Sequence, residues 1–68
     1  MIVHLNGAPR EVLDGATVGT LVDDLDVARE RRGVAVAVGG EVVPRASWDE
    51  RVLSDGARVE VVHAVQGG

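Results

Sequence analysis

The fold is decided by the stretch TVGTLVDDL, residues 17–25, which has the clearest helical pattern in the chain. Its apolar residues recur at the spacing i, i+3, i+4 and i+7, so their side chains share one face of an α-helix. They are Val18, Leu21, Val22 and Leu25. Thr17 directly precedes them and is a favoured N-cap residue. The stretch therefore predicts one amphipathic helix that must bury its apolar face against another element.

Polar residues fill the rest of the helical segment. Asp23, Asp24 and Asp26 lie away from the first turn, where the helix dipole would favour acids, so we interpret them as a solvated acidic face. Residues 29–33 are basic, with Arg29, Arg31 and Arg32, and end in a glycine. This composition is typical of a helix C-terminus, so the helix is predicted to end near residue 33.

The chain before the helix predicts a β-hairpin. Residues 1–5 are apolar and rich in β-formers, and they lead into Asn6-Gly7, the dipeptide that most favours a type I′ turn. The next two residues, Ala-Pro, leave a slightly longer loop open. Residues 10–13 are predicted to return as an edge strand, with Arg10 able to point to solvent.

The chain after the helix predicts three more strands. Residues 34–38 are apolar on both faces, as in a strand with cover on both sides or beside a partner surface. Gly39-Gly40 favours a turn into residues 41–43, and Pro44 ends that strand because it cannot donate to a ladder. An irregular or single-turn helical crossing over residues 45–51 carries Trp48, which we interpret as a core plug. It leads to a final strand over residues 59–65.

The predicted order is hairpin, helix, hairpin, crossing turn and strand. This order indicates an α+β fold, a ubiquitin-like beta-grasp in which a mixed sheet of four to five strands packs on one helix. The last strand can then insert beside the first. At 68 residues the chain is predicted to form one domain, 1–68, with a flexible C-terminal tail at 66–68.

The composition excludes several classes of function. The chain has no cysteine, which removes disulfides, thiolate zinc sites and cysteine nucleophiles, and favours a reducing cytoplasm. A net charge of −4, scattered arginines and a single aromatic residue argue against a nucleic-acid partner. No segment approaches the roughly 20 apolar residues of a membrane-spanning helix, so we expect no membrane partner.

Few side chains suggest a catalytic or metal site. His4 and His63 lie on predicted strands without a third ligand or a nucleophile at useful spacing, so we expect surface or interface residues and no metal. Arg45 could pair with Glu41 or Asp49, or could contact a partner. We predict no catalytic residue in this chain.

Several motifs together are typical of one family. The most discriminating is Val-Pro-Arg-x-x-Trp at residues 43–48. The others are Asn6-Gly7, Gly15-x-Thr17-Val18-x-x-Leu21, Leu53-x-x-Gly56 and Gly67-Gly68. With these motifs the chain resembles the thiamin-biosynthesis sulfur carriers, the ThiS family, along nearly its whole length. It departs from the family pattern at Gly39-Gly40, Ala57 and Gln66, which leaves room for a sulfur carrier of another pathway.

The resemblance implies a chemistry at the C-terminus. An adenylating (E1-like) enzyme would use ATP to convert the Gly68 carboxylate to an acyl adenylate. A persulfide from a cysteine desulfurase system would then displace the adenylate and leave a thiocarboxylate, which gives its sulfur to thiazole synthase. The carrier would hold no permanent cofactor and catalyse nothing itself. Glycine at 67 and 68 suits a tail that threads into a narrow channel, because it lacks a Cβ.

The residues before the tail predict a docking surface. Val62, Ala64 and Val65 lie on faces that so small a core cannot all cover, so an exposed apolar patch is expected there. With Gln66 they would dock the adenylating enzyme and thiazole synthase. Three alternatives stay open: a molybdopterin-synthase small subunit, another beta-grasp sulfur carrier, and a ubiquitin-like protein modifier.

Overall fold

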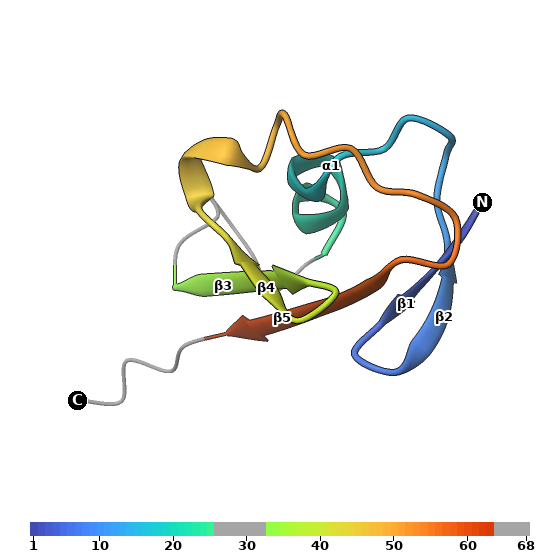
Figure 1. The fold of residues 1–68 in the computed structure, drawn as a ribbon, viewed down its shortest axis with the longest axis horizontal. Helices are drawn as coiled ribbons and strands as arrows, with labels where there is room; N and C mark the ends of the chain where they lie inside the picture. The colour runs from blue at the N-terminus through green and yellow to red at the C-terminus, as the bar shows by residue number, and fades with distance from the viewer. Residues whose placement is uncertain (26–32, 64–68) are drawn as a thin grey trace.

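The computed structural model describes residues 1–25 and 33–63, except the side chain of His63. Within this part of the chain, five strands form one mixed sheet and one α-helix packs on a single face of it (Figure 1). The elements are β1 (Ile2–Leu5), β2 (Ala8–Glu11), α1 (Val18–Asp23), β3 (Val34–Val38), β4 (Glu41–Val43), the 3-10 turn η2 (Arg45–Ser47) and β5 (Arg58–His63). The predicted beta-grasp arrangement is confirmed.

The last strand lies in the middle of the sheet. The strand order is β2-β1-β5-β3-β4, so β5 joins the two hairpins, and the predicted insertion beside the first strand is confirmed. It pairs with β1 in parallel, His4 opposite Arg58, and with β3 in antiparallel fashion, Val36 opposite Val61. The sheet therefore depends on contacts between the two ends of the sequence.

The first hairpin closes through a two-residue turn. Asn6 and Gly7 both have positive φ, 51° and 86°, and Leu5 pairs directly with Ala8, as the type I′ geometry requires. The longer loop is therefore ruled out, and β2 begins at Ala8 instead of residue 10 and ends at Glu11. Pro9 fits within this strand because β2 is at the sheet edge, where a missing N–H breaks no ladder bond.

The side chain of Arg10, which was expected to be able to point to solvent, instead lies on the helix side of the sheet. Its register partner is Val3, a core residue, so the Arg10 side chain projects on the helix side of the sheet. Its Nη2 donates to Asp24 Oδ2 at 2.8 Å, and about a third of the side chain, 35%, remains exposed. The pair links the edge strand to the end of α1.

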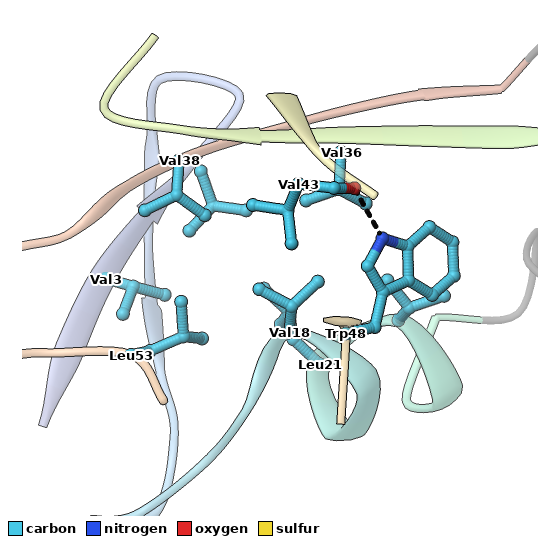
Figure 2. Close-up of a cluster of buried hydrophobic side chains, with 10 residues drawn as sticks. Val3, Val18, Leu21, Val36, Val38, Val43, Trp48 and Leu53 are labelled. Carbon is cyan, nitrogen blue, oxygen red and sulfur yellow. Dashed lines mark hydrogen bonds between the residues drawn. The ribbon is translucent and has the colours of Figure 1, made fainter. Parts of the chain in front are cut away.

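The core lies between the sheet and the helix (Figure 2). Its buried side chains are Val3, Val18, Leu21, Val22, Val36, Val38, Val43, Trp48, Leu53 and Val59, and Leu25 packs against them. The predicted apolar face of the helix is thus confirmed. Trp48 is only 1% exposed, and its indole Nε1 donates to the Val43 carbonyl at 2.9 Å, which confirms its prediction as a core plug.

The first amides of α1, which have no acceptor within the helix, donate to other parts of the chain. Val18 N–H donates to the Arg51 carbonyl and Gly19 N–H to the Trp48 carbonyl, at 2.9 and 3.0 Å. Thr20 N–H donates to the Thr17 hydroxyl at 3.1 Å, and Thr20 in turn accepts from the Thr17 amide, which completes a capping box. The crossing segment thus fixes where the helix begins.

The helix ends earlier than predicted. α1 stops at Asp23. The Asp24 amide is shared between the carbonyls of Thr20 and Leu21, and the Leu25 amide donates to Val22, three residues back, which tightens the chain. Asp23 and Asp24 are exposed, as expected. Asp26, Arg29, Arg31 and Arg32 lie outside the described residues. No helix in the described part of the chain is long and apolar enough to cross a membrane.

Candidate functional site

The predicted docking residues divide between described and undescribed parts of the chain. Val62 is in β5, and its side chain is 62% exposed. Its neighbour Val61 packs against the core, so strand alternation places Val62 on the sheet face that the helix does not cover. The other predicted residues, Ala64, Val65, Gln66, Gly67 and Gly68, lie outside the described residues.

Three further apolar side chains share this uncovered face with Val62. Ala35 on β3 lies directly opposite Val62. Val42 on β4 is 70% exposed and lies directly opposite Ala37 on β3. Side chains directly opposite one another lie about 4.5–5.5 Å apart at Cβ, so the four adjoin. We name this set, Ala35, Ala37, Val42 and Val62, the open-face patch. It covers the sheet beside the last described residues of the chain.

Two sequence patterns pointed to the three residues that the docking prediction missed. The run Val34–Val38 is apolar on both faces, and the structure buries Val36 and Val38 while leaving Ala35 exposed. The partner-surface interpretation of this strand is therefore compatible with the structure, and the described residues leave the Ala35 side of β3 exposed. The exposure of Val42 follows from strand alternation, because the next residue, Val43, is buried.

The uncovered face becomes charged toward the first hairpin. His4, exposed on β1 as expected, is opposite Arg58 on β5, and Glu60 follows Arg58 on the same face. Among the described residues, no group of three or more His, Asp or Glu side chains could hold a metal ion. Near β4, Arg51 approaches Glu41 at 4.0 Å, and the exposed Arg45 begins the η2 turn.

The comparisons with known proteins assign the chain to a family. The sequence model of the ThiS family matches residues 3–68, which is nearly the full length. The chain belongs to the ThiS family. The match extends through the Gly67-Gly68 end, which the structure leaves undescribed.

Named relatives of this ThiS-family chain agree with that assignment. The sulfur carrier protein ThiS of Thermus thermophilus is 40% identical over 67 residues, covering 98% of this chain and all of that protein. The crystal structure of the thiamine biosynthesis protein ThiS from Geobacter metallireducens superposes with a TM-score of 0.82 at 33% identity, with both chains fully covered.

A larger relative contains a similar region. The thiazole synthase of Magnetococcus marinus is 38% identical over all 68 residues of this chain, which spans only 20% of that protein's length. A ThiS-like sequence and a thiazole synthase are therefore parts of one polypeptide there.

Proposed function

We propose that this protein carries sulfur for the synthesis of the thiamin thiazole, as a thiocarboxylate on the C-terminal carboxyl group of Gly68. The observation that supports this most is that the match to the ThiS family extends to residue 68 and includes the diglycine. A chain without cysteine can carry sulfur covalently in this way, because its carboxyl group provides the attachment point.

The proposed chemistry takes place in partner enzymes. The Gly68 carboxylate attacks the α-phosphate of ATP on an adenylating enzyme, which releases pyrophosphate and leaves an acyl adenylate. The terminal sulfur of a persulfide, supplied by a cysteine desulfurase system, attacks the acyl carbon and displaces AMP. A second thiol of the donor system then attacks the donor sulfur of the resulting acyl disulfide. The two donor thiols become a disulfide, and the thiocarboxylate is released.

The open-face patch is proposed as the docking surface for these partners. Exposed apolar side chains on a flat sheet lose unfavourable contact with water when a partner covers them. The patch adjoins the end of β5, from which residues 64–68 continue, so docking there would hold the tail near the partner's active site. Thiazole synthase is the proposed acceptor, and the relative that combines both sequences in one chain supports that choice.

The test is the mass of the protein after incubation with the adenylating enzyme, ATP and a persulfide donor. We expect the gain that corresponds to one oxygen replaced by sulfur, located on the C-terminal peptide. Deletion of Gly68 should abolish the gain while the circular dichroism spectrum stays unchanged. Addition of one residue after Gly68 should do the same, since the reacting carbonyl is displaced from the nucleotide. Normal sulfur loading of the deletion variant would falsify the proposal.

The acceptor is tested separately. Purified sulfur-loaded carrier is mixed with thiazole synthase and its other substrates, and loss of the thiocarboxylate is followed by mass. Assembly with the large subunit of molybdopterin synthase would instead support the alternative that this chain is the small subunit of that enzyme. Isopeptide conjugates to other proteins would support the protein-modifier alternative.

A further inference from the structure

The side chain of Asn6 makes a two-point contact with the backbone of β5. Its Oδ1 accepts from Val61 N–H at 2.9 Å, and its Nδ2 donates to the Val61 carbonyl at 3.2 Å. The backbone amide of Asn6 also donates to the Val59 carbonyl at 2.8 Å. One residue at the turn of the first hairpin therefore holds three polar groups of the central strand.

The side-chain amide of Asn6 substitutes for missing backbone in the β1–β5 ladder. In this ladder, His4 N–H donates to the Ala57 carbonyl and Asn6 N–H donates to the Val59 carbonyl. The next residue of β5 in this ladder is Val61. At this point β1 has ended, because Asn6 turns into the left-handed region with φ 51°. The carboxamide presents the same donor and acceptor as a peptide group, and it extends the pairing by one step.

This contact lies where the strand approaches the functional end of the chain. From Val61 to His63, β5 is paired on one edge with β3, through Val36, Ala35 and Val34. On the opposite edge Asn6 holds Val61. Val61 is thus held on both edges, one residue before Val62 of the open-face patch.

We propose that Asn6 is a positioning residue for the sulfur-carrier reaction, one that fixes the exit of β5 and so limits where residues 64–68 can reach in the adenylating enzyme. The inference rests on the proposed function. A rigid exit point reduces the number of tail conformations that keep Gly68 away from the nucleotide, and so raises the fraction of docked carriers that react.

Asn6→Gly is the variant that tests this role. Glycine accepts the positive φ of Asn6, and the Gly39-Gly40 turn of the same chain shows two adjacent glycines, φ 61° and 83°, closing a two-residue hairpin. The variant therefore keeps the turn and removes the side chain, and with it the carboxamide that bonds to Val61. Asn6→Asp is a second variant, which keeps an acceptor for Val61 N–H but loses the donor to the Val61 carbonyl.

Asp55→Ala is the matched control. Asp55 Oδ1 accepts from Ile2 N–H at 2.9 Å, so this variant removes a side-chain bond to the backbone at the other end of β1. It should lower global stability comparably while leaving the contact at Val61 intact. All assays are run at a temperature where each variant is fully folded by circular dichroism.

Two measurements decide the inference. In Asn6→Gly the Val61 amide should exchange with solvent roughly tenfold faster, whereas Asp55→Ala should leave it unchanged relative to its neighbours. With the adenylating enzyme, Asn6→Gly should lower kcat for adenylation about tenfold and change KM by less than about twofold, because the open-face patch is intact. Asn6→Asp should fall between Asn6→Gly and the unaltered protein in both measurements.

The outcomes that overturn the inference are distinct from failure of the proposed function. Unchanged Val61 exchange in Asn6→Gly, or an unchanged kcat, rejects the positioning role, as does an equal loss of kcat in Asp55→Ala. If the unaltered protein gains no sulfur at all, the proposed function fails, and the assignment of Asn6 to that reaction fails with it. The exchange data, obtained without any enzyme, then still decide whether Asn6 holds β5.

Discussion

Trp48 connects β4 to α1 and fills the core between the sheet and the helix. Its indole fills the core, its Nε1 donates to the β4 carbonyl of Val43, and its own carbonyl accepts from Gly19 in the first turn of α1. The other core residues are aliphatic, and most are valines, so no neighbouring side chain has the volume to replace a lost indole. Close-packed interiors relax only partly around such a gap.

Replacement of Trp48 tests this dependence. Trp48→Ala should cost about 3–5 kcal/mol of unfolding free energy, which is much of the total for a chain of this length, and should leave the protein largely unfolded. Trp48→Phe keeps most of the apolar volume and loses the bond to the Val43 carbonyl, so we expect a folded protein that is weaker by about 1–3 kcal/mol. Urea titration followed by circular dichroism measures both. An Ala variant as stable as the Phe variant contradicts the packing argument.

At the scale of elements, α1 is stable only because of its surroundings. A helix of six residues is too short to persist in water alone. Its amides are satisfied by the Thr17 cap and by the carbonyls of the crossing segment, and its apolar face is buried. The cap is the part of this arrangement that one substitution can remove.

Thr17→Ala should therefore lower the unfolding free energy by about 1 kcal/mol, since the Thr20 amide loses its acceptor at the helix start. Thr17→Ser is the matched control, because it keeps the hydroxyl, and it should change stability by a few tenths of a kcal/mol. Chemical denaturation of the three proteins side by side gives the comparison. Equal losses in both variants would mean that the methyl group, not the hydroxyl, stabilises this position.

The elements themselves followed from local patterns, whereas several of their limits did not. Apolar periodicity placed α1, and a continuous apolar run placed β3. The dipeptides Asn6-Gly7 and Gly39-Gly40 placed the hairpin turns. The end of α1 and the start of β2 depended on tertiary pairing that periodicity does not encode. Ala8 and Pro9 left a longer loop open, and only the pairing of Leu5 with Ala8 excludes it. The pairing of Arg10 with Val3 likewise places Arg10 on the helix side of the sheet.

At the scale of the whole molecule, the helix packs on one face of the sheet, and the described residues leave the other face uncovered. The covered face was predictable, because a single amphipathic helix needs a sheet to pack on. Of the open-face patch, only Val62 was predicted from the sequence. The other patch residues lie on β3 and β4, and their position beside Val62 depends on the order of the strands in the sheet. The tail residues of the predicted site lie outside the described residues, so their roles stay predictions.

Val62→Asp tests whether the uncovered face is used. The side chain is exposed, so we expect a loss of about 1 kcal/mol or less in stability, but sulfur loading by the adenylating enzyme should fall about tenfold in kcat/KM. Val52→Asp is the matched control, because Val52 is 57% exposed and lies outside the patch, on the segment paired with Thr17. Steady-state kinetics of both variants should separate them. Equal losses would place the docking surface elsewhere.

The central position of β5 also matters for how the protein is made in a cell. Among the described strands, β5 is the last one synthesised, yet it joins the hairpin of β1 and β2 to that of β3 and β4. Neither hairpin can therefore complete this sheet before β5 is made. A chain broken off within β5 therefore cannot fold, and proteases remove unfolded chains. Copies that end within β5 would thus be degraded before they could compete with intact chains for partner proteins.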